Sequence, residues 1–289
     1  MKFWLGASFS DTDQFIELAK VAERCGFDTL TLSDHLFYAD FATPYPYSKS
    51  GRPRWNAETH WPDVWVTIGA MAAVTSTLRF APNVYIAPAR DLFTVAKQVS
   101  TAAVLSKDRV SFGVGVGWCE EEFAATGQDF HTRGRRLDGM IPTLRDLWTG
   151  RAVKLDGLPE LSISPTPAEP IPVIVGGDSE AALRRAARLG DGWIGNRIYG
   201  EEQFDAVLES LGRQLAEHGR TGPFEIIAPL AVLPEADTYR RFADKGVTGT
   251  MAAPWWLATP EEKERYGEGS LELKIATMER FADEVIAKM

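Results

Sequence analysis

Four short stretches carry side chains that could do chemistry, and each of them follows or ends an apolar run. They are "TLSDH" (31–35), "PNVY" (82–85), "GVGVGW" (113–118, followed by the acidic run 120–122) and "VIVGGDS" (173–179). Histidine and carboxylate side chains can move protons, and a glycine turn that opens a helix can bind an anion. These residue types predict acid–base chemistry beside a bound anionic molecule, provided that the fold brings the four stretches together.

His35 is the residue in these stretches best suited to proton transfer, because imidazole titrates near neutral pH. It follows Asp34, but neighbours in a strand point to opposite faces, so the two cannot readily share a metal ion. The other histidines, His60, His131 and His218, are scattered without ligand spacing. The G-x-S-x-G, Walker and C-x-x-C motifs are absent. We therefore predict that His35 carries a proton or contacts a cofactor, and we expect no metal site.

The stretch "VIVGGDS" has the clearest physical mechanism. Gly176 and Gly177 let backbone amides turn toward an oxyanion, and Ser179 begins a helix whose N-terminus offers N–H groups and partial positive charge. Such a turn holds a phosphate without a basic side chain. Asp178 adds negative charge nearby, so an ordinary turn in which Ser179 only caps the helix is the alternative.

The run "RVSFGVGVGW" (109–118) places three glycines at alternate positions of a predicted strand. The dinucleotide fingerprint needs G-x-G-x-x-G and an acidic residue about twenty positions on. Here the spacing is G-x-G-x-G and that later position is Arg133, so the fingerprint fails. The glycines around Gly115 instead predict an empty strand face against which a flat ring could lie, with Trp118 at its rim. Relief of crowding inside a barrel is the other interpretation.

Eight apolar runs alternate with amphipathic segments, and these elements must position the four stretches. The predicted strands are 2–8, 27–34, 78–86, 109–116, 171–177, 191–196, 224–233 and 247–254. Segments such as 11–26 and 179–190 have the apolar spacing of helices. Eight β-α repeats imply parallel strands with right-handed crossovers, and eight such strands close a barrel. We therefore predict one α/β domain over residues 1–289, a (β/α)8 TIM barrel; a doubly wound open sheet is the alternative.

Three insertions interrupt this alternation, at about 36–60, 151–170 and 254–269. The first and third follow strands, so we expect them at the C-terminal face, where barrel enzymes build their sites. Long loops in compact domains are lids, binding loops or disordered segments. The aromatic residues of these insertions either cover a substrate or pack against the barrel or a second subunit.

The composition limits the classes of function. The chain has 289 residues, 45% of them hydrophobic and 25% charged, with a formal net charge of −9. Nucleic acid selects basic surfaces, so we expect no nucleic-acid partner. No apolar run is long enough for a membrane helix or a signal peptide, so we expect no membrane partner. Two cysteines, Cys25 and Cys119, are too few for a disulfide framework and favour a cytoplasmic location.

Taken together, these stretches resemble the luciferase-like monooxygenase superfamily, and within it the branch that uses the deazaflavin coenzyme F420. The resemblance covers nearly the whole chain and is strongest in "RVSFGVGVGWCEEEFAATGQDFHTRGRRLDGM" and "PVIVGGDSEAALRRAARLGDGWIGN". It implies a (β/α)8 barrel with a flavin-like ring in its mouth. It also implies that Gly176, Gly177 and Ser179 hold the cofactor phosphate.

The resemblance assigns further roles at the strand ends. The residues implied to face the ring or the cofactor tail are Asp34, His35, Asn83, Val84 and Asn196. Family members often have a non-prolyl cis peptide at the position of Asn83–Val84. Trp118 stands where some deazaflavin dehydrogenases carry a catalytic glutamate, so no acid is carried over to that position. Asp178 is unusual beside a phosphate.

The implied reaction is hydride transfer between C5 of F420 and a small organic substrate, with His35 as proton donor or acceptor. Insertion 36–60 and Trp255–Trp256 would cover an apolar or aromatic substrate. The resemblance also implies a homodimer and a separate reductase for the cofactor. Two alternatives stay open: a two-component monooxygenase that uses reduced FMN and oxygen, and a flavin-binding protein without catalysis. Neither the substrate nor the direction of hydride transfer follows from the sequence.

Overall fold

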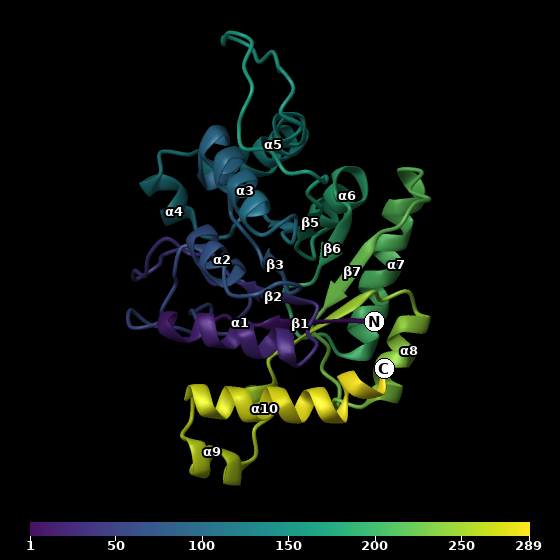
Figure 1. Cartoon of the computed structure of the whole chain (residues 1–289). Coiled ribbons are helices and arrows are strands. Elements are labelled where there is room, and N and C mark those ends of the chain that lie inside the picture. Colours follow the sequence, from purple (N-terminus) through teal and green to yellow (C-terminus); the bar gives the residue numbers. More distant parts are fainter.

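A computed structural model describes residues 1–289 and contains eight parallel strands surrounded by helices (Figure 1). The strands are β1 Lys2–Gly6, β2 Thr29–Leu32, β3 Arg79–Pro82, β4 Phe112–Val114, β5 Val173–Gly176, β6 Gly192–Ile194, β7 Glu225–Ala228 and β8 Gly249–Ala252. Their order is β3-β2-β1-β8-β7-β6-β5-β4. Bridges between Phe80 and Val110 and between Tyr85 and Val114 join the two ends of that order. The predicted barrel is confirmed, and the open-sheet alternative is wrong because these bridges close the order between β3 and β4.

Ten α-helices connect or flank these strands (Figure 1). They are α1 Phe15–Arg24, α2 Val64–Ala72, α3 Leu92–Leu105, α4 Glu120–Ala125, α5 Arg133–Trp148, α6 Glu180–Leu189, α7 Glu201–Glu217, α8 Ala236–Asp244, α9 Pro260–Tyr266 and α10 Leu271–Glu284. All eight predicted strands are present, and the helices over 11–26 and 179–190 correspond to α1 and α6. The apolar face of α1 is buried, as its spacing predicts.

Alternation along the strands separates two apolar layers. In β1, Trp4 packs inside the barrel with Ile174, Ile194 and Ile227 from β5, β6 and β7. Its neighbour Phe3 instead belongs to the larger layer between the strands and the helices. Inward-facing side chains therefore fill the barrel, as in other barrels of eight strands. A bound molecule must lie at an end of the barrel.

The three insertions take different forms. Residues 33–63 contain no helix or strand and lie between β2 and α2. The 151–170 insertion forms a projecting arm between α5 and β5, with an antiparallel bridge from Val153 to Leu161 (Figure 1). The 254–269 insertion holds a 3₁₀ turn and α9, whose start has a capping box formed by Thr259 and Glu262. No helix is long and apolar enough to span a membrane.

The turn that leads into β3 is anchored by Glu23 of α1. One carboxylate oxygen of Glu23 accepts the backbone N–H groups of Ser76, Thr77 and Leu78 at 2.8, 2.5 and 2.9 Å. Burial by itself would raise the pKa of Glu23, but these hydrogen bonds, Thr77 first, lower it from 4.5 to about 2. The anchor therefore ties α1 to the start of β3.

Replacing Glu23 by Ala should lower the free energy of unfolding at pH 7 by about 1–2 kcal/mol, because three N–H groups lose their acceptor and only those of the exposed Ser76 and Thr77 lie beside water. The folded pKa is depressed, so this stabilisation is present above pH 4.5 and is lost as the pH falls toward 2. Urea unfolding at pH 7 and pH 2.5 measures it. Glu17→Ala, which removes an exposed pair with Lys20, is the control. An equal loss at both pH values would contradict the anchor.

Candidate active site

The carboxyl ends of the strands bring the predicted site residues to one end of the barrel. The hydroxyl of Ser33 donates to the carbonyl of Asn83 at 2.9 Å and so links the ends of β2 and β3. Val84 packs against glycines of β5 and of the segment after β4. His35 packs against Trp118, with ring centroids 5.8 Å apart. The four stretches therefore form one site, as parallel strands in a barrel require.

His35 is paired with Glu122 of α4. Its Nδ1 lies 2.9 Å from Oε1 of Glu122, and the same oxygen accepts the N–H of Leu36 at 2.9 Å. The side chains of His35 and Glu122 are 9% and 3% exposed. Nε2 of His35 makes no hydrogen bond within the protein. This nitrogen is therefore available to exchange a proton with a bound molecule.

Aromatic side chains of the loop after β2 cover His35. Its ring lies 4.7 Å from that of Trp55 and 4.8 Å from that of Trp61, and these two indoles are 5.2 Å apart. Tyr45 packs against Trp118 at 5.2 Å. The indole N–H groups of Trp55 and Trp61 are buried and have no acceptor. The aromatic residues of insertion 36–60 thus pack over the predicted site and shield it from water.

A second glutamate of α4 holds the same loop. Oε1 of Glu121 accepts the backbone N–H groups of Ala42 at 2.7 Å and Thr43 at 2.9 Å. Burial by itself would raise the pKa of Glu121, but backbone hydrogen bonds, with that of Thr43 strongest, lower it to about 2. Glu121 is therefore ionised at neutral pH, and its bonds to the loop are charge-assisted.

The carboxylate of Asp34 is bound on both oxygens by the segment after β3. Asp34 is 7% exposed, and it accepts the N–H of Ile86 at 2.9 Å and a guanidinium N–H of Arg90 at 2.8 Å. Its side chain therefore has other partners than that of His35, although both residues lie just beyond the end of β2. The contact of Asp34 with a ring stays a prediction, whereas its observed role is to fix the backbone beyond β3.

The strand face that we predicted to be empty is filled by Val84. A Cβ atom on Gly115 would lie 2.4 Å from Cγ2 of Val84, and one on Gly176 would lie 2.5 Å from Cγ1. The empty wall is therefore wrong, and relief of crowding is the correct interpretation of these glycines. Val84 now occupies the place that we had given to a ring beside Gly115. Contact between Gly115 and a cofactor stays a prediction.

Asn83 carries an acceptor that the protein does not use. The Asn83–Val84 peptide bond is cis, as the resemblance implies. Nδ2 of Asn83 donates to Sδ of Met251 at 3.6 Å, but Oδ1 is buried and receives no hydrogen bond. A buried acceptor without a donor costs free energy, so Oδ1 is suited to an N–H group of a bound molecule.

The turn after β5 has the geometry of the predicted anion site. Gly177 has φ +117°, a conformation that L side chains rarely adopt. The hydroxyl of Ser179 caps α6 by accepting the N–H of Ala182 at 3.2 Å. The N–H groups of Glu180 and Ala181 have no acceptor in the protein. Ser179 is thus a helix cap, and the same turn still offers amides to an anion.

The charge of Asp178 is offset by its neighbours. Its carboxylate accepts the hydroxyl of Tyr199 and pairs with Arg197 at 2.8 Å. In the amide orientation that satisfies all its neighbours, Asn196 donates to both carboxylate oxygens at 3.0 Å and accepts the hydroxyl of Tyr47 at 2.6 Å. Burial, with a smaller effect of Asp178, raises the pKa of Tyr47 to about 12, so that hydroxyl remains a donor. This network ties the covering loop to the ends of β5 and β6.

Comparison with known proteins identifies the family. A family model described as luciferase-like monooxygenase matches residues 4–270. The chain belongs to the luciferase-like monooxygenase family. An uncharacterized protein of Mycobacterium tuberculosis is 34% identical over 297 residues, which cover 100% of both chains. An F420-dependent glucose-6-phosphate dehydrogenase of Kribbella flavida is 29% identical over 285 residues, which cover 93% of this chain and 76% of that one.

Solved structures agree with the fold of this luciferase-like oxidoreductase. A monooxygenase from Streptomyces bottropensis has a TM-score of 0.69 at 16% identity, covering 100% of this chain and 99% of that one. A coenzyme F420 dependent tetrahydromethanopterin reductase from Methanopyrus kandleri has a TM-score of 0.64 at 15% identity, covering 96% and 84%. At these identities the likeness supports the fold alone. The predicted family and enzyme class are confirmed.

Several residues of the luciferase-like site were not predicted from the sequence. Glu122 stands in a run of three glutamates, and nothing in the run marks the one that turns inward. Trp55 lies within the aromatic-rich insertion 36–60 and Trp61 directly after it, but a loop without periodicity gives no partner for either. Tyr47 lies in the same loop, and its partner likewise cannot be predicted from the sequence. Only the folded loop assigns these side chains to His35 and Asn196.

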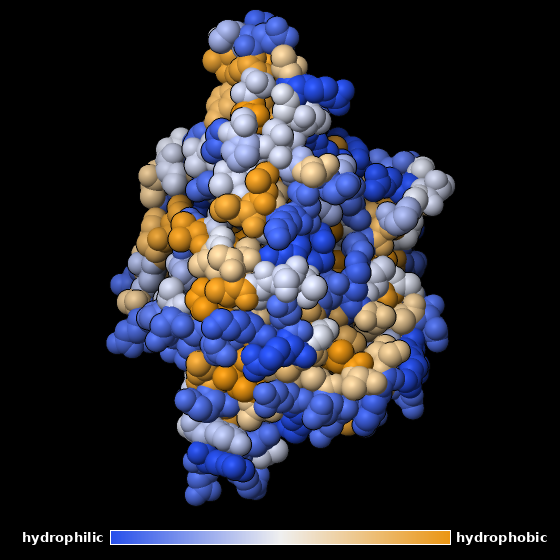
Figure 2. All heavy atoms as spheres, in the orientation of Figure 1, coloured by the Kyte–Doolittle hydropathy of each residue, from blue (hydrophilic) through white to orange (hydrophobic).

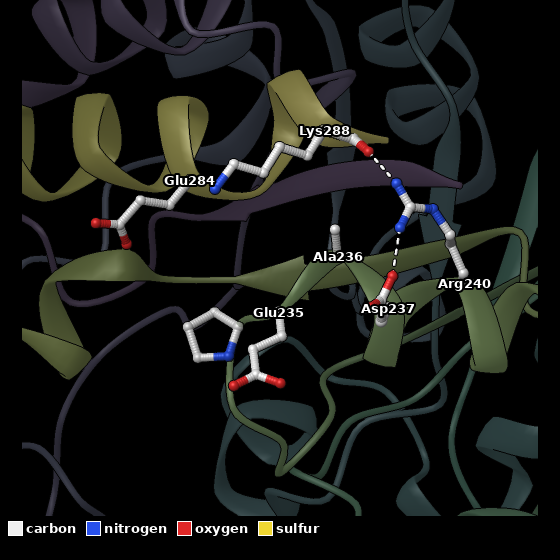
Figure 3. A pocket seen from close by; sticks show the side chains of 7 residues that line it. Glu235, Ala236, Asp237, Arg240, Glu284 and Lys288 are labelled. Atoms are coloured by element: carbon white, nitrogen blue, oxygen red, sulfur yellow. Dashed lines mark hydrogen bonds and ion pairs between the residues drawn. The ribbon is translucent and has the colours of Figure 1, made fainter.

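A charged pocket elsewhere in the luciferase-like chain contains none of the predicted site residues. It lies where α8 begins beside the C-terminal residues, and Figure 3 shows Arg240 bound there by Asp237 and the carbonyl of Lys288. The guanidinium of Arg240 is therefore already bound by groups of the protein. No group of three or more His, Cys, Asp or Glu side chains could hold a metal ion.

Gly176→Ala would place a methyl group 2.5 Å from Val84. We expect it to lower the free energy of unfolding by roughly 1–3 kcal/mol through overpacking. Adding Val84→Ala should recover part of that loss, because the removed methyl groups supply the space. Denaturant unfolding of the two single variants and the double variant forms the cycle. Gly69→Ala in α2, where a Cβ meets nothing within 4 Å, should be neutral or stabilising. Strict additivity would contradict the packing.

Proposed function

We propose that this protein is an F420-dependent oxidoreductase that transfers a hydride between the deazaflavin and a small organic substrate. The observation that carries the proposal is the buried His35–Glu122 pair under an aromatic cover at the mouth of a luciferase-like barrel. Such a pair can deliver or remove one proton as a hydride is transferred. The F420-dependent dehydrogenase among the relatives supports the deazaflavin branch.

The residues at the mouth fit an anionic cofactor with a polar ring. The turn at Gly176 and Gly177 and the unbonded amides after Ser179 would receive the phosphate. The unused Oδ1 of Asn83 would accept an N–H of the ring, and Val84 would support the ring face. When bound, F420 supplies the hydride chemistry, and the protein supplies binding, orientation and electrostatics. Trp118 and Asn196 would border the ring and the tail.

The protein's own residues would then complete the reaction. Nε2 of His35 exchanges the proton, since it has no partner within the protein. The covering loop excludes water and is held in place by Glu121 and by the bond from Tyr47 to Asn196. Exclusion of water strengthens electrostatic interactions at the reacting atoms.

The cover also limits the class of substrate. The indole rings of Trp55 and Trp61 favour an apolar or aromatic body. Their buried N–H groups lack an acceptor, which favours a substrate with an oxygen at or near its reacting carbon. We propose that the enzyme acts in the cytoplasm, consistent with its two free cysteines. There a separate reductase would renew the cofactor.

Binding titrations test the cofactor directly. The purified protein should bind oxidised F420 at micromolar or lower concentration and FMN at least tenfold more weakly, a difference of about 1.4 kcal/mol or more. Cofactor fluorescence follows both titrations, and reduced F420 then serves in a substrate screen. A preference for FMN would contradict the proposal and favour the two-component monooxygenase. Tight F420 binding without turnover of any donor or acceptor would favour a non-catalytic flavin-binding protein.

We also propose that two copies of the chain associate through α2 and α3. Val66 is 73% exposed, Leu105 is 63% exposed and Phe93 is 38% exposed, all on these two helices. Figure 2 shows hydrophobic residues on the side of the molecule where α2 and α3 lie in Figure 1. Exposed apolar surface of this kind is typical of subunit contacts.

Sedimentation velocity should give a species of about twice the chain mass of 31.9 kDa. The double variant Val66→Asp, Leu105→Asp should shift it toward the monomer, because it places charges in the contact. Leu233→Asp is the matched control, since Leu233 is 74% exposed but lies between β7 and α8. A wild-type monomer at all concentrations would contradict the dimer.

A further inference from the structure

We propose that Glu122 is a positioning residue that keeps the proton of neutral His35 on Nδ1 and so presents Nε2 to the substrate. This inference rests on the proposed function and deepens it, because it names the atom that exchanges the proton and the group that selects it. Glu122 itself touches neither substrate nor cofactor in this scheme. It acts through the imidazole.

With Glu122 ionised, the hydrogen bonds at its Oε1 allow only one arrangement of protons. Oε1 lies 2.9 Å from Nδ1 of His35 and 2.9 Å from the N of Leu36, which can only donate. An ionised carboxylate can only accept, so Nδ1 must carry the hydrogen that lies between it and Oε1. In neutral imidazole the other nitrogen then has a free lone pair. The bond from Leu36 fixes the carboxylate, because it comes from the backbone next to the histidine.

Burial of Glu122 prevents its hydrogen bond to His35 from being exchanged for one to water. The side chain of Glu122 is 3% exposed, and its only ion-pair partner is His35. Replacing that bond with water would require opening the site, and an unpaired buried carboxylate is costly. A proton that arrives at Nε2 therefore produces an imidazolium directly beside its counter-charge. When the imidazole releases that proton, the buried carboxylate keeps its hydrogen bonds to Nδ1 of His35 and to the N–H of Leu36.

The walls around His35 direct the exchange toward a bound molecule. Trp55, Trp61 and Trp118 pack against the ring, and none of them can accept a proton. In the oxidative direction a substrate O–H bond breaks and its proton passes to Nε2. A bound deazaflavin would supply the acceptor for the hydride of the carbon, and the electron pair of the O–H bond would form the C=O bond. Reduction reverses each transfer.

The adjacent glutamate provides a contrast within the same turn of α4. Glu121 binds the backbone of Ala42 and Thr43 and makes no hydrogen bond to His35. It therefore holds the loop without affecting the imidazole protons. Variants at these two neighbouring positions should separate proton positioning from loop closure.

Nitrogen-15 NMR of histidine-labelled protein reads the proton position without any cofactor or substrate. The chain has only four histidines, so His35→Asn identifies the signal of His35. At a pH where this ring is neutral, we expect the hydrogen on Nδ1 in the wild type. A hydrogen on Nε2 in the wild type would overturn the inference, and this result needs no variant other than the one used for assignment.

Variants at Glu122 extend the test. Glu122→Met keeps the length and apolar bulk but removes the acceptor, so the Nδ1 preference should be lost. Glu122→Gln keeps an acceptor at Oε1 and should retain the preference, and Glu121→Gln should leave it unchanged. Identical proton positions in the wild type and Glu122→Met would overturn the inference. Thermal unfolding checks that each variant is folded.

Kinetics then connect the proton position to turnover. We expect kcat of Glu122→Met to fall on the order of 10²–10⁴-fold with KM little changed, as when a buried carboxylate behind a catalytic histidine is removed. Glu122→Gln should fall less, and Glu121→Gln should mainly raise KM. An unchanged kcat in Glu122→Met would overturn the positioning role. Absence of F420 turnover in the wild type, with the expected NMR result, would contradict the proposed function but not the proton assignment.

Discussion

A single carboxylate oxygen, Oε1 of Glu122, joins the candidate proton carrier to the loop that covers it. It binds Nδ1 of His35 and the N–H of Leu36 near the start of that loop, both at 2.9 Å. Because the carboxylate is almost fully buried, these two donors are its available partners, and neither can move alone. The position of the imidazole, the path of the loop and the dryness of the site therefore depend on α4 lying against the end of β2.

The place of α4 depends in turn on closure of the barrel between β3 and β4. Two single bridges close that seam, and the side chain of Val84 fills the space that two glycines leave open. The mouth is thus built by close packing of backbone and one small side chain. Some polar groups around the mouth have no hydrogen-bond partner in the protein, namely Oδ1 of Asn83 and the first amides of α6. This combination of a rigid frame and unused hydrogen-bonding groups is what a ligand site requires.

Much of the fold followed from pattern alone. The alternation of apolar runs with amphipathic segments predicted every strand, and the strand ends predicted which stretches would meet. The glycine run was harder to interpret, because a missing side chain can leave space either for a ligand or for a neighbouring side chain. Val84 decided this for Gly115, and it lies in the segment after β3. Asp34 was correctly placed at the mouth, but its donors Ile86 and Arg90 come from a segment that the local sequence does not pair with it.

The sequence by itself determined the barrel, the end that holds the site, and His35 as the residue suited to proton transfer. These depend on periodicity and on the chemistry of single residue types, both of which are local. Only the tertiary structure decided that Glu122 is the glutamate that binds His35, that Trp55 and Trp61 cover it, and that Asp178 is offset by Arg197 and Tyr199. Each of these pairings joins residues of different elements or of an aperiodic loop. They form because burial leaves a polar or charged group few partners, and the identity of those partners is set by packing in three dimensions.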